Sequence, residues 1–262
     1  MLRLSQMPWR EVRAAGERGA VAVLPIGSQE QHSEHLPMGT DTLLVEAALD
    51  AAARLLDAED PGPELVRLPV LPFGHSPHHL FAAAVSLSDE VLLAVLTDVL
   101  DSLVRSGFRR VLVVNGHGGN EEIMRLAVKR CALRSDVALA ACSYWSVARP
   151  GGPPEDPDRT PGHAGWFETS LMLAAHPDLV GTPAAWQEPV EPPLFDRPPA
   201  AGLLVERHGE WERVHGTTDD AAAADAGVGQ ELLVRRAGGL ADAIRAFDLA
   251  TRHSHARQTG EA

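Results

Sequence analysis

The sequence has few cysteines, a deficit of basic residues and no long apolar run. Its 262 residues include two cysteines, Cys131 and Cys142, neither in a CxxC or Cys/His metal pattern, so we expect reduced core thiols in a cytoplasmic protein. The 23 Lys and Arg residues are outnumbered by 36 Asp and Glu residues, which gives a net charge of -13 and argues against binding to a nucleic-acid backbone. No run approaches the roughly 20 apolar residues of a membrane span, and residues 1–20 carry no apolar signal segment, so neither membrane association nor export is expected.

Familiar catalytic and nucleotide-binding motifs are also absent. No G-x-S-x-G elbow occurs, because the glycines of "NGHGGN" (115–120) flank a histidine, and this argues against a Ser-His-Asp hydrolase. A P-loop and a dinucleotide-binding fingerprint are missing as well.

Short apolar runs alternate with helical periods along the chain. The strand candidates are residues 20–26, 64–73, 109–115 and 136–144, and the clearest helices cover 88–105, a segment starting at Asn120, and 226–251. This alternation predicts an α/β fold with a mainly parallel sheet, and the 45% hydrophobic content suits one domain over residues 1–252. The proline-rich segments 149–162 and 188–202 are expected to form loops over the sheet, and residues 253–262 a disordered tail.

Polar clusters follow the predicted strands at the points where they end. The segment "GSQEQHSEHLPMGTD" (27–41) follows the first strand, "FGHSPHH" (73–79) the second and "NGHGGN" the third, while "GHAGWFETS" (162–170) opens a helix. Loops after the carboxyl ends of parallel strands share one edge of the sheet, where ligands bind. The residues expected to converge at this edge are Glu30, His32, Asp41, His117, His163 and Glu168.

The chemistry of this set indicates a metal site. Carboxylates and imidazoles without a thiolate are the ligands that divalent zinc, manganese or iron take. Two such ions typically lie ~3.5 to 4 Å apart and lower the pKa of a bridging water toward ~7. The expected reaction is therefore metal-assisted hydrolysis.

Single polar residues also have simpler interpretations. Taken one at a time, the following histidines are expected on the solvated surface: His75, His78, His79, His208, His215, His253 and His255. His176 fits a partner of a helix C-terminal dipole, and Asn115 with the glycines after it fits a tight turn. Glu34 and His35 are either partners of the ligands or exposed. Trp145 and Trp166 fit core or lid packing.

Three segments resemble the creatininase (creatinine amidohydrolase) family in content, order and approximate spacing. They are "LPIGSQEQHSEHLPMGTD", "VVNGHGGN" and "GHAGWFETSLMLAAHPDLV", within a similarity that spans roughly residues 8–250. The resemblance implies a three-layer α/β/α fold, two divalent metal ions per subunit (zinc first, with manganese or iron as the other candidates) and assembly into homo-hexamers. By position, Glu30 and His117 would hold one ion and His32 the other, with Asp41 bridging them. His163 matches a histidine with an acid/base or substrate-orienting role.

The chain departs from creatininase proper at two places. Creatininase proper takes its remaining carboxylate from a Tyr-Glu pair after the "NGH" histidine, where this chain has Gly118 and Gly119. Glu168, which matches the family's "ETS" segment, is then the expected ligand and a second catalytic group. The absent pair also argues against creatinine as the substrate. Residues 82–84 are alanines where relatives commonly carry Pro-Gly-Thr, so substrate contacts in that loop stay open.

These observations together predict a dinuclear-metal-dependent amidohydrolase. Its substrate would be a small molecule with a non-peptidic C–N bond, in a cyclic amide or a formamide. Three alternatives stay open: a peptidase that matures a small ribosomal peptide, as the mycofactocin-maturation peptidases of this family do; a formamidopyrimidine-type deformylase; and a metal-binding relative that has lost turnover.

Overall fold

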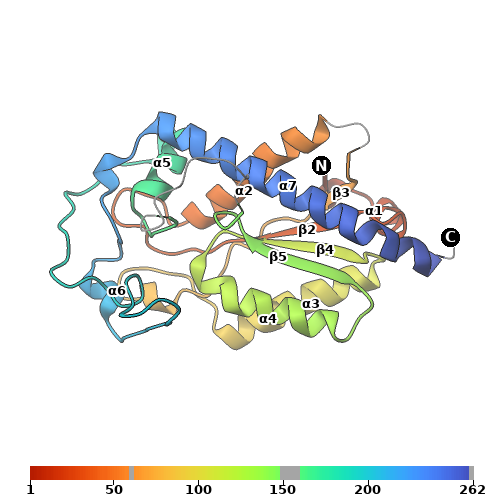
Figure 1. Ribbon diagram of the computed structural model, residues 1–262, viewed down its shortest axis with the longest axis horizontal. Coiled ribbons are helices and arrows are strands. Elements are labelled where there is room, and N and C mark those ends of the chain that lie inside the picture. The colour runs from red at the N-terminus through yellow and green to blue at the C-terminus, as the bar shows by residue number, and fades with distance from the viewer. Residues whose placement is uncertain (59–61, 148–159, 260–262) are drawn as a thin grey trace.

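Five parallel strands form one sheet in the computed structural model, which describes residues 1–58, 62–147 and 160–259. The strands are β1 (Leu2–Arg3), β2 (Val21–Ile26), β3 (Leu65–Arg67), β4 (Arg110–Asn115) and β5 (Ala138–Ser143). Their order across the sheet is β1-β3-β2-β4-β5, and every neighbouring pair is parallel (Figure 1). The predicted α/β class with a mainly parallel sheet is confirmed.

The two central strands align the loops that follow them. Every residue of β2 and β4 is buried, as expected for central parallel strands covered on both faces. The register pairs Ile26 at the end of β2 with Asn115 at the end of β4. Because both strands finish level, the loops that begin at Gly27 and Gly116 leave the same edge of the sheet.

Helices cover both faces of the sheet and complete three layers (Figure 1). The helices of one face are α2 (Thr40–Asp57), α5 (Trp166–Ala175) and α7 (Ala226–Thr259), and those of the other face are α1 (Trp9–Glu17), α3 (Asp89–Arg105) and α4 (Glu121–Ala132). Leu44, Phe167 and Leu240 belong to the core on the first face. Leu96 and Met124 belong to the core on the second face.

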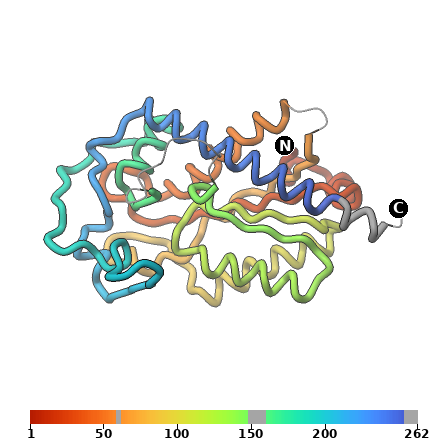
Figure 2. Tube along the Cα trace, viewed as in Figure 1, coloured from red at the N-terminus to blue at the C-terminus, as the bar shows by residue number. Residues whose placement is uncertain are grey.

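The chain between α5 and α7 gathers at the end of the sheet where the strands finish. This stretch contains the four-residue helix α6 (Glu210–Arg213) and short 3-10 turns, and the trace in Figure 2 shows it running beyond the strands. Hydrogen bonds attach it to the loop after β2: Gly181 N donates to His35 O (2.7 Å), and Gln31 Nε2 donates to Gly216 O (3.1 Å). Residues 188–202 contain neither helix nor strand, as predicted for a loop.

Several boundaries differ from those predicted. The strand expected over 64–73 shortens to β3, because Pro69 and Pro72 cannot donate to a strand ladder. The strand β1 was not predicted, and α7 continues to Thr259 rather than ending near residue 251. Asn120 precedes α4 but does not cap it, because its Oδ1 accepts from His75 N (2.9 Å) instead, while its Nδ2 donates to Gly27 O (3.0 Å).

Other predictions are confirmed. Helix α3 begins where expected, and Ser88 Oγ accepts a hydrogen bond from Val91 N (3.3 Å) at its start. Cys131 is buried in α4, Cys142 is half-buried in β5, and both are free thiols.

None of the described helices is long and apolar enough to cross a bilayer. The domain boundary at residue 252 stays a prediction, and residues 149–159 of the first proline-rich segment lie outside the described residues.

Candidate metal centre

Six titratable side chains meet at the carboxyl edge of the sheet. They are Glu30 and His32 in the loop after β2, Asp41 in the first turn of α2, His117 directly after β4, His163 before α5, and Glu168 in the first turn of α5. The exposed fraction of every one of them is 6% or less. The structure therefore brings together all six residues that the sequence singled out, although their roles as ligands stay a prediction.

Asp41 lies at the centre of the cluster. Its Oδ1 is 3.2 Å from His32 Nε2, and its Oδ2 is 3.2 Å from His117 Nδ1. Gly116 makes this approach possible, because a Cβ at that position would lie 2.5 Å from the Asp41 carbonyl oxygen. Glu30 Oε2 lies 3.3 Å from His117 Nε2, and Glu168 Oε2 lies 3.7 Å from His32 Nε2.

Two groups of three side chains therefore share one carboxylate. Glu30, Asp41 and His117 form one group, and His32, Asp41 and Glu168 form the other; in each group one ligand atom per residue lies within 4.8 Å of the others. Glu30 belongs to two further groups of this kind, one with His32 and His163 and one with His78 and His79. Two ligand triads with a common carboxylate are the arrangement expected of a dinuclear metal site.

Buried polar atoms in this cluster lack hydrogen-bond partners among the described residues. They include Glu30 Oε1 and Oε2, His32 Nε2 and Asp41 Oδ2. A buried carboxylate without a partner is costly, and such atoms call for an ion or another compensating group. Because the orphaned atoms are the oxygens and nitrogens that a divalent cation takes as ligands, the residues fit divalent-metal binding.

In His32 and His117, the ring nitrogen that faces away from Asp41 lies next to a main-chain oxygen. This contact determines which nitrogen carries the hydrogen when the ring is neutral. His32 Nδ1 lies 3.1 Å from the main-chain oxygen of Glu30, which can only accept, so Nδ1 carries the hydrogen. His117 Nε2 lies 3.0 Å from the main-chain oxygen of His75, so there Nε2 carries the hydrogen. Each neutral ring then presents its lone pair to Asp41, and this outer hydrogen bond is typical of metal-bound histidine.

In His32 and His117, nearby carboxylates raise the pKa, whereas burial lowers it. Burial disfavours a charged His32, but Asp41 and Glu168 outweigh it and raise the pKa of His32 to about 10. Burial likewise disfavours a charged His117, but Glu30 and Asp41 raise its pKa to about 9. Burial raises the pKa of Glu168 to about 8 and also raises that of Glu30. The carboxylates thus attract positive charge into the cluster, either as protons or as cations.

The Nδ1 atom of His163 faces the cluster and carries a lone pair. Its Nε2 donates to the main-chain oxygen of Gln31 (2.9 Å), which leaves Nδ1 unprotonated at 3.6 Å from Glu30 Oε1. Burial and the nearby His32 hold the pKa of His163 well below its usual range. Its main-chain nitrogen donates to Thr218 Oγ1 (2.7 Å), which holds the backbone at this residue.

The structure adds residues that sequence reasoning missed. His79 was expected on the surface, but it is fully buried and its Nε2 lies 3.3 Å from Glu30 Oε1, so that prediction is wrong. Its place after β3, at the same edge as the other clusters, was the available signal. Trp211 in α6 also covers the cluster, with ring centroids 4.7 Å from His79 and 5.5 Å from His163. Nothing in the aperiodic sequence around Trp211 indicated this contact.

The remaining single-residue predictions have mixed outcomes. His75 and His78 are half-buried rather than solvated, whereas His208 and His215 are exposed as expected. The side chains of His253 and His255 lie outside the described residues. His176 follows the last residue of α5, and Trp145 and Trp166 pack against the core, as predicted. Glu34 is exposed, while His35 is buried with Nε2 2.8 Å from Thr169 Oγ1.

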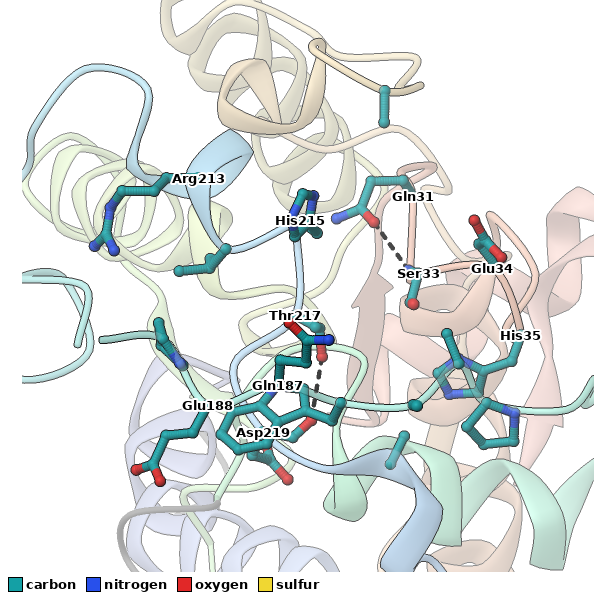
Figure 3. Close-up of a pocket in the computed structure, with 18 of the residues that line it drawn as sticks. Gln31, Ser33, Glu34, His35, Gln187, Glu188, Arg213, His215, Thr217 and Asp219 are labelled. Atoms are coloured by element: carbon teal, nitrogen blue, oxygen red, sulfur yellow. Dashed lines mark hydrogen bonds between the residues drawn. The ribbon is translucent and has the colours of Figure 1, made fainter. Parts of the chain in front are cut away.

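A cavity of about 760 Å³ lies beside the cluster. Figure 3 shows Gln31 and His35 among its lining residues, with His215 next to Gln31 and Arg213 farther from both. Gln31 separates the cavity from the buried cluster, because its side chain lines the cavity and also contacts His79 (2.9 Å).

The fold and the cluster define a class: a three-layer α/β protein with a buried carboxylate–imidazole site at the carboxyl edge of a parallel sheet. The family model described as "Creatininase: Creatinine amidohydrolase" matches residues 5–244. The chain belongs to the creatininase family, a family of hydrolases.

Three relatives have assigned activities. The chain is 30% identical to a creatinine amidohydrolase of Pseudomonas putida over 261 residues, covering 92% of this chain and 95% of that protein. It is 33% identical to a mycofactocin precursor peptide peptidase of Mycobacterium tuberculosis, covering 66% of this chain and 70% of the peptidase. It is 27% identical to a 3-dehydro-scyllo-inosose hydrolase of Thermotoga maritima, covering 78% of this chain and 66% of the hydrolase.

Solved creatininase structures share the fold. A structure described as "Creatininase Mn" superposes with a TM-score of 0.68 at 27% identity, covering 94% of this chain and 98% of that one. A mutant creatininase described as "Zn-Zn type" superposes with a TM-score of 0.67 at 27% identity, covering 93% and 97%. These structures, with the clustered acids and histidines, indicate divalent-metal binding in this family.

Proposed function

We propose that the protein is a dinuclear-metal-dependent amidohydrolase that cleaves a non-peptidic C–N bond in a small cyclic amide or formamide. The observation that carries this proposal is the pair of ligand triads that share Asp41. Membership of the creatininase family supports the reaction class. In this proposal Glu30, Asp41 and His117 hold one ion, and His32, Asp41 and Glu168 hold the other.

The residues around the two triads would position groups and move protons. When bound, two divalent cations supply charge that polarises an amide carbonyl and lowers the pKa of water. His163 Nδ1, unprotonated because Nε2 donates to Gln31 O, would accept a proton from the attacking water and return it to the leaving nitrogen. Glu168 Oε2 accepts a hydrogen bond from Ala164 N (2.6 Å), which would hold this carboxylate in place as a ligand and catalytic group.

Zinc is the first candidate for the ions, with manganese or iron as the others. Carboxylate and imidazole ligands accept all three metals, and availability then decides among them. The manganese and zinc forms of creatininase support the first two candidates.

The proposed substrate differs from creatinine. A Cβ at Gly119 would overlap the His75 carbonyl oxygen and crowd His117 Nε2, so a glutamate ligand does not fit at this position. Creatininase proper has its Tyr-Glu pair here, and a pocket without that pair is expected to select another amide.

A peptidase that matures a small ribosomal peptide is the second candidate. The mycofactocin precursor peptide peptidase is 33% identical over 189 residues.

A matched pair of substrate panels tests the proposal. The protein would be stripped of metal, reloaded separately with zinc, manganese or iron, and assayed for release of ammonia, amine or formate from cyclic amides and formamides, including a formamidopyrimidine. The parallel panel would contain short peptides and creatinine. Metal-dependent turnover in the first panel supports the proposal, and turnover of peptides alone favours the peptidase. Two bound ions with no turnover in either panel would favour the relative that has lost catalysis.

We also propose a homo-hexamer in the cytoplasm, on the basis of the family resemblance and the scarcity of cysteine. Light scattering coupled to size-exclusion chromatography measures the assembly directly, and a monomer at micromolar concentration would contradict the proposed hexamer.

A further inference from the structure

His79 is a fourth buried histidine beside the proposed ligands, and it presents an N–H group to them where His32 and His117 present lone pairs. His79 Nε2 lies 3.3 Å from Glu30 Oε1, and its Nδ1 lies 2.9 Å from Gln31 Nε2. Its geometry alone would allow it to be a metal ligand, since Glu30, His78 and His79 offer atoms within 4.8 Å of one another. The ring nitrogen that carries the hydrogen decides between a ligand and a donor.

The Gln31 amide is oriented by two main-chain groups that do not involve His79. Ser33 N donates to Gln31 Oε1 (2.9 Å), and Gln31 Nε2 donates to Gly216 O (3.1 Å). Gly216 has φ +65°, and a Cβ there would overlap the Gln31 amide, so the approach of the two segments requires glycine. The nitrogen of the amide, rather than its oxygen, therefore faces His79.

This orientation determines the hydrogen on His79. Gln31 Nε2 has two hydrogens and three close neighbours, which are Gly216 O (3.1 Å), His79 Nδ1 (2.9 Å) and His163 Nε2 (3.1 Å). Because His163 Nε2 donates its own hydrogen to the main-chain oxygen of Gln31, it cannot accept, and the two amide hydrogens go to Gly216 O and His79 Nδ1. His79 Nδ1 therefore accepts, and the hydrogen of the ring lies on Nε2. Placing a hydrogen on Nδ1 would set two N–H groups against each other. The tautomer is opposite in effect to that of His32 and His117, whose inner nitrogens carry lone pairs.

His79 Nε2 and Glu30 Oε1 are both buried and without a hydrogen-bond partner among the described residues, 3.3 Å apart. We propose that His79 is a positioning residue whose Nε2–H pairs with Glu30 Oε1 when the site is occupied and so directs Glu30 Oε2 toward the site shared with His117 and Asp41. Gln31, which lines the cavity, sets this tautomer and also donates to Gly216 O (3.1 Å). Glu30 Oε2, the other oxygen of this carboxylate, lies 3.3 Å from the protonated Nε2 of His117, and Glu30 offers a ligand atom within 4.8 Å of those of Asp41 and His117. This inference rests on the proposed dinuclear site and adds two residues to it.

The tautomer can be measured directly. Long-range 1H–15N spectra of zinc-loaded protein with 15N-labelled histidine would distinguish protonated from acceptor ring nitrogens, with the His79 signals assigned by their loss in His79→Phe. The expected result is a hydrogen on His79 Nε2 and an acceptor at Nδ1. A hydrogen on His79 Nδ1, or 113Cd coupling to the His79 ring in cadmium-loaded protein, would overturn the proposal.

Paired variants test the consequence for metal binding. His79→Phe keeps an aromatic ring but removes the N–H donor. It is expected to lower the affinity for one of the two ions by about 10- to 100-fold, which is the usual effect of losing a hydrogen-bond partner of a ligand. His79→Gln can place an amide N–H near the position of Nε2 and is expected to recover most of that affinity. His35→Phe and His35→Gln are the matched controls, because His35 is also a buried histidine but lies in the loop after β2 and contacts Thr169 Oγ1 (2.8 Å) rather than Glu30.

The outcomes separate this inference from the proposed function. Parental affinity in His79→Phe, or an equal loss in His35→Phe, would overturn the positioning role. If His79→Phe fails to fold, the cadmium-coupling spectrum of the parent protein and the metal affinity of His79→Gln decide. A parent that binds no ions refutes the proposed function, whereas two bound ions with His79 as a ligand refute only the positioning role.

Discussion

Replacing Asp41 with asparagine is expected to lower the binding affinity for both proposed metal ions. The two oxygens of Asp41 lie 3.2 Å from His32 Nε2 and 3.2 Å from His117 Nδ1, so each triad takes one of them. Asparagine keeps the shape but removes the charge and one oxygen. Losing a hydrogen-bond partner of a ligand typically costs 10- to 100-fold in metal affinity, so losing a shared anionic ligand is expected to cost more than about 100-fold per ion.

The expected loss is large enough to appear as a change in thermal stability. If free metal exceeds the parental Kd by about 1,000-fold, each ion stabilises the folded state by about 4.1 kcal/mol. A 100-fold weaker site keeps about 1.4 kcal/mol of this, so the two ions together lose about 5 kcal/mol. At about 2 to 4 °C per kcal/mol for a chain near this size, the metal-induced rise in Tm should shrink by about 10 to 20 °C.

The assay compares melting with and without metal in each variant, so any effect of the substitution itself cancels. Asp50→Asn is the matched control on the same helix, because Asp50 Oδ1 pairs with Arg67 (2.5 Å) rather than with the cluster. Titration calorimetry gives the stoichiometry. An Asp41→Asn protein that binds two ions with parental affinity would refute the reasoning, and loss of only one ion would show that Asp41 does not bridge.

Three further predictions follow from the geometry of the site. His163→Gln should lower turnover by about 10²- to 10⁴-fold while two ions stay bound, and loss of an ion by metal analysis would instead make His163 a ligand. Glu168→Gln should weaken one ion in calorimetry and leave the other at parental affinity, so equal weakening of both contradicts the division into two triads. Gly119→Glu should lower Tm well below that of Gly118→Glu, because an added Cβ overlaps the His75 oxygen at 119 and meets no described atom within 4 Å at 118; equal melting temperatures would contradict the close packing at 119.

The edge of the sheet could be predicted from sequence because a few local rules determine it. Buried apolar runs predicted β2 and β4, and their parallel pairing sets Ile26 level with Asn115. The polar residues that follow then have to meet, which is why Glu30 and His117 were expected together from distant parts of the chain. The five ligand candidates depended on this topology and on the family resemblance rather than on any single motif.

The residues that close the site could not be predicted in the same way. His79 ends a three-residue 3-10 turn, Pro77–His79, which is too short to show a period, so its burial had no signature. Gln31 was indistinguishable from a surface amide until Gly216 and Ser33 oriented it. Trp211 reaches the cluster from an aperiodic segment whose position depends on tertiary contacts alone.

Anomalous diffraction from crystals of the metal-loaded protein, collected at the zinc, iron and manganese edges, tests the central claim most directly. The account predicts two peaks about 3.5 to 4 Å apart, one bound by Glu30, Asp41 and His117 and the other by His32, Asp41 and Glu168. A single peak, or a peak bound to His79 Nε2, would contradict it.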